Sequence, residues 1–330
     1  MQTRRMSNTT REVADFLQGL DKAAVTTHVG ADGDAIGSAS ALVRLAQALG
    51  AEARFCHAEE VPDYLRWLLP DEPLRECPPG YDLLVVDTSR ADRAGVAHEG
   101  VHPVRLNLDH HEDNPFYGEF NLVDQKAAAS AQIVAALYAE LGVPLSKEAA
   151  EAIYAGISTD TGGFRFRNVS PEAHELVADL LRAGVVPAEV SNRINRTGTV
   201  EQLNIVGVSM AKAERYGEAL ISTVNDDDYE RTGATELDSK ESIDRLRSVA
   251  GVEVVGHLRQ IEGGTKASLR SESVDVGAIA RAFGGGGHRL AAGYTTPKAP
   301  QEAKEELLAV LEGVVGLGGG GGGDPDGRVG

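Results

Sequence analysis

The chain has 330 residues, of which 42% are hydrophobic and 25% charged, and its formal net charge is −18 at pH 7. This length allows two domains that each bury a core, and the negative charge argues against a protein that binds long DNA or RNA by neutralising many phosphates. No apolar run approaches the ~20 residues that span a membrane, so we expect a cytoplasmic protein without membrane contacts, for which small phosphorylated ligands remain open.

The first half of the chain alternates short β-rich runs with helical patterns, which is typical of an α/β domain with a parallel sheet. The run 83–86 is apolar at every position, as in a central strand covered on both faces. We predict strands at 23–27, 52–56, 83–86 and 104–108, and helices at 35–49, 130–141, 147–157 and 171–182. These elements define a first domain over residues 1–198.

The second half has a different pattern. A helical segment at 199–216 is expected to connect the two domains. Strands are predicted at 219–224, 252–260 and 265–271, and helices at 276–283 and 301–314. This order predicts a smaller α+β domain over residues 217–315. The remaining segment, 316–330, is dominated by glycine and is predicted to be disordered.

Histidine and aspartate side chains follow three of the predicted strands. Open α/β sheets bind ligands at the carboxyl ends of their strands, and carboxylates with neutral imidazoles bind hard divalent cations. No thiolate accompanies them, which favours manganese or magnesium over a structural zinc. The candidates are His28, Asp32 and Asp34 after the first strand, Asp87 after the run 83–86, Asp109, His110 and His111 after the run 104–108, and Asp160 at the end of a helical run.

Each of these aspartates taken alone has a simpler structural explanation. Asp34 could cap the following helix, and Asp87 could form a turn with Thr88 and Ser89. Three strand ends carry such residues together, however, and the spacing of Asp32 and Asp34 would let one loop serve two neighbouring metals. We therefore favour a two-metal site over separate structural roles.

Five segments, in this order, resemble the signatures of a known family. His28-x-x-x-Asp32-x-Asp34, Asp87, Asp109-His110-His111 and Asp160-Thr161-Gly162 resemble the four motifs of the DHH phosphoesterases, and the glycine-rich segment 283–288 resembles the signature of the DHH-associated C-terminal domain. The chain as a whole resembles the branch of nanoRNases, also called oligoribonuclease/pAp phosphatases. The resemblance spans about residues 10 to 315.

The resemblance implies two divalent metal ions, with Mn²⁺ as the expected ion. His28 and Asp32 would hold one ion, and Asp34, His110 and Asp160 the other. Asp87 would bridge the two ions, Asp109 would orient a ligand imidazole, and His111 would face the substrate phosphate. Water would then attack phosphorus without a covalent enzyme intermediate, with Asp87, Asp109 and His111 as the catalytic group.

The second domain is expected to bind the substrate. The backbone N–H groups of the glycine run could form a concave nest for an anion, to which His288 would add charge or a hydrogen bond. A glycine run alone more often marks a flexible loop, but this one lies between a helix and an apolar segment. The resemblance adds Arg270 as a phosphate-binding residue, and the full predicted set is Arg270, Gly285, Gly286, Gly287 and His288.

Arg165 and Arg167 alternate with two phenylalanines, as they would in a strand. They follow Asp160 closely, so one of the two arginines is expected near the substrate. The sequence does not decide which.

These observations predict a hydrolase that cuts short RNA oligonucleotides to 5'-mononucleotides and also removes the 3'-phosphate of adenosine 3',5'-bisphosphate. Hydrolysis of cyclic or linear dinucleotides by the same residues stays open, as does a non-catalytic nucleotide-binding sensor. A pyrophosphatase is disfavoured by the glycine-histidine signature. The family resemblance is compatible with a homodimer, and long duplex nucleic acid is not an expected partner.

Overall fold

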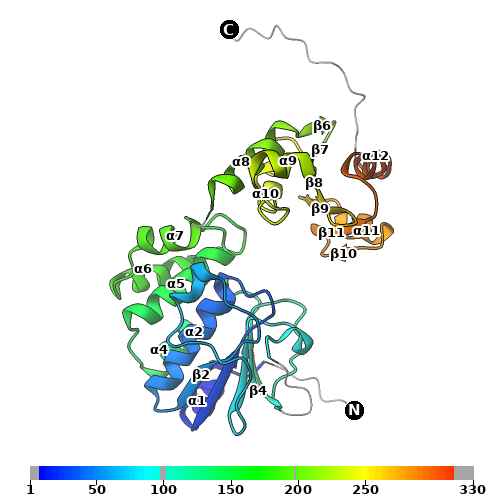
Figure 1. Cartoon of the computed structure of the whole chain (residues 1–330). Coiled ribbons are helices and arrows are strands. Elements are labelled where there is room, and N and C mark those ends of the chain that lie inside the picture. Colours follow the sequence, from blue (N-terminus) through cyan, green and yellow to red (C-terminus); the bar gives the residue numbers. More distant parts are fainter. Residues whose placement is uncertain (1–6, 97–101, 197, 316–330) are drawn as a thin grey trace, which may run out of the picture. The chain divides into compact units, whose positions relative to one another are not determined.

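The computed structural model describes residues 7–96, 102–196 and 198–315, and the chain forms two compact units, residues 1–197 and 198–330 (Figure 1). The segment 316–330, predicted to be disordered, lies outside the described residues. The first unit is α/β with a parallel sheet and the second is α+β, as predicted.

The first unit contains a five-stranded parallel sheet in the order β2-β1-β3-β4-β5. The four predicted strands are present within one residue at each end, whereas the short edge strand β5 was not predicted. Residues 83–86 of β3 are fully buried, which confirms the prediction of a strand covered on both faces. The strands are β1 (Lys22–Thr26), β2 (Glu52–Phe55), β3 (Asp82–Val86), β4 (Val104–Asp109) and β5 (Phe120–Val123).

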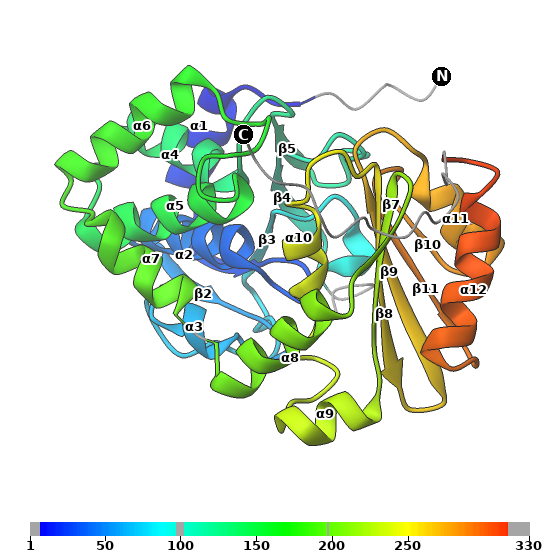
Figure 2. The ribbon, with the colours of Figure 1, turned by 90° about the horizontal axis from the view of Figure 1, so that it is seen from above.

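The helices of the first unit gather mainly on one face of this sheet, where α2, α4 and α5 pack against one another (Figure 2). The opposite face is covered by a smaller cluster that includes Cys56, Cys77 and Val96. The helices are α1 (Thr10–Gln18), α2 (Gly33–Ala48), α3 (Asp63–Arg66), α4 (Ser130–Leu141), α5 (Lys147–Asp160), α6 (Pro171–Arg182) and α7 (Pro187–Asn195), with a 3₁₀ turn, η1 (Ala91–Arg93).

The strand order creates a switch point between β1 and β3. From β1 the chain proceeds to β2 on one side, whereas β3 lies on the other side and continues outward to β4 and β5. Loops that leave neighbouring strands in opposite directions open a crevice at the carboxyl ends of those strands, which is the usual ligand position in such sheets. His28 follows β1 and Asp87 follows β3, so the fold brings both to this crevice.

The second unit is a six-stranded mixed sheet in the order β10-β11-β9-β8-β7-β6, in which only β7 and β8 are parallel. Within this unit, α11 and α12 pack on one face, and α8 and α10 on the other (Figure 2). The strands are β6 (Glu214–Tyr216), β7 (Ala219–Val224), β8 (Val254–Ile261), β9 (Gly264–Ser271), β10 (Gly286–Gly287) and β11 (Ala291–Thr296), and the helices are α8 (Val200–Ala211), α9 (Asp226–Thr232), α10 (Ser242–Leu246), α11 (Val276–Ala282) and α12 (Pro300–Leu311).

The segment predicted as an interdomain connector is instead part of the second unit. Helix α8 ends at Ala211, and its Ile205 is fully buried against Val224 and Ala234. Ser209 of the same helix lies 2.9 Å from Ser222 Oγ of β7. An apolar contact and a buried polar contact therefore fix α8 to its own sheet.

Among the described residues, no helix has the length and apolar character needed to cross a bilayer.

Close contact between α2 and α5 depends on a glycine. A Cβ at Gly37 would collide with the carbonyl oxygen of Ala152, and backbone cannot move away as a flexible side chain can. We predict that Gly37→Ala lowers the free energy of unfolding by about 1–3 kcal/mol through overpacking. The free energy of unfolding is measured by urea unfolding followed by circular dichroism. The fluorescence of Trp67, the single tryptophan, reports on the first unit.

A matched control is Gly207→Ala in α8, where a Cβ would meet nothing within 4 Å. Alanine is a better helix former than glycine, so this variant should be unchanged or more stable by up to about 1 kcal/mol. A Gly37→Ala protein as stable as the wild type would contradict the close-contact explanation.

Candidate metal centre

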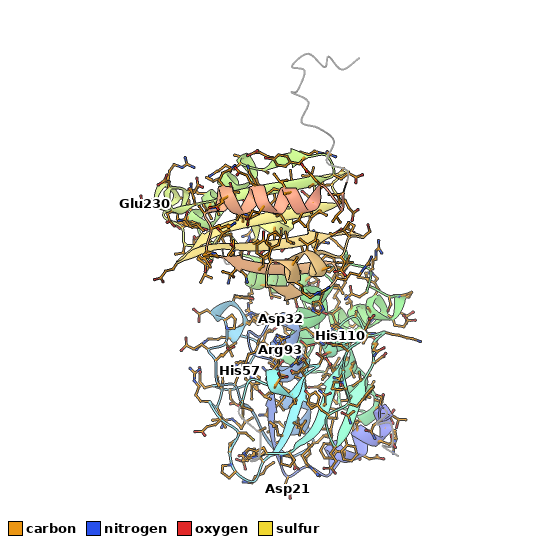
Figure 3. All side chains as sticks on the ribbon, turned by 90° about the vertical axis from the view of Figure 1, so that its right-hand side faces the viewer. Asp21, Asp32, His57, Arg93, His110 and Glu230 are labelled. Carbon is orange, nitrogen blue, oxygen red and sulfur yellow. The ribbon has the colours of Figure 1, made fainter. Side chains whose placement is uncertain are left out.

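The predicted metal-binding residues gather at the carboxyl end of the parallel sheet. Figure 3 shows Asp32 and His110 at the end of the first unit opposite Asp21, which immediately precedes β1. Three groups of side chains there have ligand atoms within 4.8 Å of one another. They are His28, Asp32 and Asp87; Asp34, His110 and Asp160; and Asp87, His110 and His111.

Asp87 lies between two of these groups. Its Oδ2 is 3.6 Å from His28 Nε2, and its Oδ1 is 3.6 Å from His110 Nε2. His28 Nε2 is also 4.0 Å from Asp32 Oδ2, and His110 Nε2 is 3.3 Å from Asp160 Oδ2. The two oxygens of one carboxylate thus face two different histidines, which is the arrangement that a bridging ligand requires.

Asp87 is held in a conformation that few residues adopt. Its φ is 51°, in the left-handed region, and the residue is 3% exposed. Ser130 Oγ donates a hydrogen bond of 3.0 Å to Asp87 Oδ1. Backbone strain of this kind costs about 1–3 kcal/mol and persists where the surrounding structure fixes it, often at functional sites. The turn that the sequence allows at Asp87 and the metal-site role are therefore compatible.

The two aspartates of the first motif have different local roles. Asp32 caps α2, because its Oδ1 accepts hydrogen bonds of 3.1 Å from the N–H groups of Asp34 and Ala35. Asp34 is therefore not the cap. Its carboxylate accepts hydrogen bonds from the N–H groups of Ser130 (2.6 Å) and Ala131 (3.0 Å) at the start of α4. Asp34 joins the first turns of two helices, where the helix dipoles favour a negative charge.

The electrostatics of the cluster suit a divalent cation. Burial, followed by the carboxylates of Asp87 and Asp160, raises the pKa of Asp34 well above its ordinary value, and burial raises the pKa of Asp160 to about 6. Burial would also raise the pKa of Asp87, but His28, His110 and His111 together lower it. Several carboxylates that oppose each other's ionisation in a buried space are stabilised by a bound cation, so these residues fit a metal centre.

Asp109 contacts a different histidine from the one expected. Its Oδ1 lies 2.7 Å from His111 Nδ1, whereas His110 Nδ1 lies 3.3 Å from the carbonyl oxygen of Ala127. Asp109 therefore contacts His111, the histidine expected to face the substrate, and not the predicted ligand His110. Asn114 Nδ2 donates to Asp109 Oδ2 at 2.5 Å, and the hydrogen bond to Asp109 raises the pKa of His111 to about 9. His111 is thus a partly exposed, positively charged donor.

His57 contacts the first metal motif in a way that the sequence did not indicate. Its side chain is 1% exposed, and its Nε2 lies 3.1 Å from the carbonyl oxygen of His28. A Cβ at Gly95 would collide with the ring, so His57 is packed between two loops. Its partners are backbone atoms, which explains why no acidic neighbour in the sequence identified it. Ser130, which contacts Asp34 and Asp87, was predicted only as the first residue of a helix.

Two of the predicted substrate-binding residues, Arg270 and His288, adjoin the same residue of β11. Arg270 of β9 pairs with Ala291 of β11, and the N–H of His288 donates to the carbonyl oxygen of Ala291 at 2.8 Å. His288 is exposed and Arg270 is partly buried. The backbones of Arg270 and His288 therefore both adjoin Ala291.

One glycine of the run, Gly285, does not fit the predicted anion nest. The N–H of Gly285 already donates to the carbonyl oxygen of Ala280 at 2.8 Å, and Gly286 and Gly287 form β10 against β11. A Cβ at Gly285 would collide with the backbone of Gly293. The prediction of a free amide at Gly285 is therefore wrong, because close strand packing explains this glycine. Direct substrate contact by Gly286, Gly287 and His288 stays a prediction.

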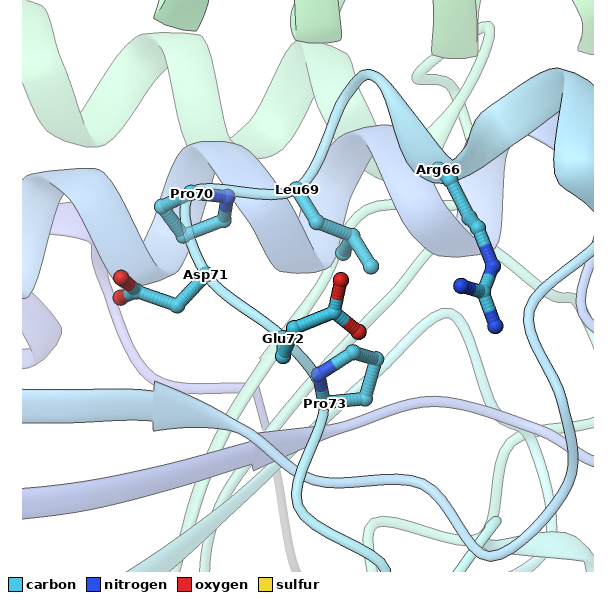
Figure 4. A pocket seen from close by; sticks show the side chains of 6 residues that line it. All are labelled: Arg66, Leu69, Pro70, Asp71, Glu72 and Pro73. Atoms are coloured by element: carbon cyan, nitrogen blue, oxygen red, sulfur yellow. The ribbon is translucent and has the colours of Figure 1, made fainter.

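The segment after Asp160 is a series of turns, so the strand expected from the alternation at 164–167 is wrong. A separate surface pocket of the first unit is lined by the last residue of α3 and by the segment that follows it (Figure 4). Its lining residues are Arg66, Leu69, Pro70, Asp71, Glu72 and Pro73, and it includes none of the predicted site residues.

Removal of one carboxylate from the cluster should stabilise the metal-free protein. The side chain of Asp160 is 28% exposed, and its pKa is raised to about 6. Its ionised form, which is present at pH 7.5, therefore destabilises the folded protein. We predict that Asp160→Asn raises the free energy of unfolding by roughly 1–2 kcal/mol in excess chelator. The sign follows from the pKa of Asp160, which is higher in the folded protein than in the unfolded chain. The folded protein therefore loses stability as the pH rises through about 6 and this carboxyl group ionises.

The control is Asp92→Asn, which removes an exposed carboxylate paired with Arg90 at 2.7 Å. An exposed surface ion pair contributes little to stability, so this variant should be unchanged or slightly less stable. A loss of stability in Asp160→Asn under chelation would contradict the repulsion argument.

Comparison with known proteins identifies both units. Residues 22–157 match the DHH family, N-terminal domain, and residues 217–317 match the DHHA1 domain. The bifunctional oligoribonuclease and PAP phosphatase NrnA of Thermus thermophilus is 38% identical over 293 residues, which are 86% of this chain and 87% of that protein.

Two solved structures share the fold. An exopolyphosphatase-related protein from Bacteroides fragilis has a TM-score of 0.82 at 22% identity, over 92% of this chain and 95% of that one. An exonuclease RecJ bound to manganese has a TM-score of 0.52 at 16% identity, over 96% and 97%. The two successive domain matches and the relative that matches along most of its length show that the chain belongs to the DHH family of phosphoesterases, with a C-terminal DHHA1 domain.

Proposed function

We propose that the protein is a divalent-metal-dependent hydrolase that cuts short RNA oligonucleotides to 5'-mononucleotides and removes the 3'-phosphate of adenosine 3',5'-bisphosphate. The observation that carries the proposal is the position of Asp87, whose two oxygens face His28 and His110 within one cluster of potential ligands. The relative from Thermus thermophilus, an oligoribonuclease and PAP phosphatase, supplies the substrate class.

The proposed ligands form two sets. His28 and Asp32 would hold one cation, Asp34, His110 and Asp160 the other, and Asp87 both; the grouping of their ligand atoms supports this division. A set of ligands made only of imidazoles and carboxylates suits Mn²⁺ or Mg²⁺. We propose Mn²⁺, which is bound in the RecJ structure of the same fold. Two such ions, when bound, stabilise charge on the attacking and departing oxygens of a phosphate ester.

The remaining residues would handle the substrate. His111, positively charged at neutral pH and 44% exposed at its side chain, would donate a hydrogen bond to a phosphate oxygen. Asp109 and Asn114 would keep its ring in place. Arg270 and His288 of the second unit would bind a further phosphate of the nucleotide, together with Gly286 and Gly287. A homodimer stays a prediction, for which light scattering is the measurement.

The substrate class is tested by rates on four compounds with added Mn²⁺: an RNA dinucleotide, adenosine 3',5'-bisphosphate, a cyclic dinucleotide and pyrophosphate. We expect the first two to be hydrolysed at least about tenfold faster than the others. Fastest cleavage of the cyclic dinucleotide would replace the proposed substrate with a cyclic one. Binding without hydrolysis of any compound would indicate a nucleotide sensor.

Asp87→Asn tests the bridging role. Asparagine tolerates a positive φ, so the backbone conformation is preserved while one negative oxygen is lost. We expect dinucleotide hydrolysis to fall at least about 100-fold, and Mn²⁺ to raise the melting temperature less than in the wild type.

The matched control is Asp82→Asn at the other end of β3, where Asp82 pairs with Arg105 at 3.1 Å. It removes the same charge from the same strand but should keep activity within about twofold. If Asp87→Asn retained full activity, the two-metal assignment would be wrong.

A further inference from the structure

An exposed phenylalanine lies in the turn that follows Asp160. Phe166 is 52% exposed, which places it among the exposed large hydrophobic residues. Its near neighbour Phe164 is directed into the unit, where its ring lies 5.9 Å from that of Tyr154 and 5.6 Å from that of His174. Of two phenylalanines separated by one residue, one therefore belongs to the core and the other faces solvent.

The turn holds Phe166 rigidly. Three N–H groups converge on Thr161: those of Arg165 (2.9 Å) and Phe166 (3.1 Å) donate to its carbonyl oxygen, and that of Phe164 (3.1 Å) donates to its Oγ1. Phe164 has a φ of 65°, a strained value for a residue with a side chain. Such strain persists only where neighbouring contacts fix it, so the exposure of Phe166 is imposed by the structure.

The turn also fixes the ring against the segment that directly follows Asp160. The Phe166 ring lies against the backbone of Gly162, where a Cβ would collide with it. At the other end of the turn, Asn168 Nδ2 donates to the carbonyl oxygens of Ala128 (2.8 Å) and Asp160 (3.2 Å). The turn is thus attached to Gly162 through the ring of Phe166 and to Asp160 through the side chain of Asn168.

Two exposed arginines flank the ring. Arg165 Nε donates to the carbonyl oxygen of Gly162 at 2.6 Å. Arg167, by contrast, makes no hydrogen bond or ion pair with the described part of the chain. In a protein with a net charge of −18, an exposed aromatic ring between two cations matches a ligand with a π-face and a phosphate, which is the chemistry by which single-stranded nucleic acids are bound.

We infer that Phe166 is the stacking platform for a base of the substrate, with Arg167 as the neighbouring phosphate contact. This inference rests on the proposed function and specifies how the nucleotide beside the metal centre is recognised. Every base has a π-face, so the contact gives affinity for nucleotides without a sequence preference. Arg165 is committed to the turn, and Arg167 is the arginine free to meet the substrate.

Phe166→Leu tests the inference on two substrates, an RNA dinucleotide and its abasic counterpart with both bases replaced by hydrogen. Leucine keeps an apolar side chain over Gly162 but cannot stack. We expect KM for the dinucleotide to rise roughly tenfold with kcat nearly unchanged, because stacking acts equally on the bound substrate and the transition state. KM for the abasic compound should stay the same.

The variant Phe166→Tyr, which keeps an aromatic ring, should have the wild-type KM. Leu181→Ala removes another exposed apolar side chain of the first unit (42% exposed) and should leave KM unchanged. An equal rise of KM on both substrates, or an unchanged KM on the dinucleotide, would overturn the stacking role. So would a change of molecular mass in Phe166→Leu, since the ring would then belong to a contact between copies. A wild-type protein inactive on the dinucleotide would instead overturn the proposed function.

Discussion

The carboxylate of Asp87 is the group on which the candidate centre depends. It lies at the carboxyl end of β3 at the switch point of the sheet, 3% exposed, between His28 and His110. Its charge is stabilised by imidazoles on both sides, and its unusual φ directs the two oxygens toward different histidines. Asp87 belongs to two of the three groups of candidate ligands, one with His28 and Asp32 and one with His110 and His111, so it links the two sides of the centre.

The support around Asp87 comes from parts of the chain that are distant in sequence. Ser130 contacts Asp87 through its hydroxyl and Asp34 through its N–H, so the start of α4 is tied to both β3 and α2. His57 stabilises the loop of His28 from another side. The centre is therefore assembled by tertiary contacts, and its geometry requires the whole first unit to be folded.

The sequence predicts that the candidate ligands gather at one place because their positions follow from strand ends, which hydrophobic patterns locate within a residue. It does not predict His57, whose partners are backbone carbonyl oxygens, nor the partner of Asp109, since adjacent histidines cannot be distinguished without a structure. The alternation at 164–167 is equally expected for a strand and for a turn with one side chain in and one out. The glycine at 285 permits close strand packing, which sequence alone cannot distinguish from an anion-binding loop.

The glycines between α2 and α5 have a consequence for ion choice. A Cβ at Gly37 would meet the backbone of Ala152, and one at Gly156 would meet Asp34 and Ala131. Asp34 and Asp160, members of one candidate group, belong to these two helices, so the spacing of their carboxylates is set by backbone contact and not by flexible side chains. Ca²⁺, with its longer bonds and higher coordination number, needs a more adaptable site than Mg²⁺ or Mn²⁺ does, so a centre whose width is set in this way would favour the smaller, six-coordinate ions.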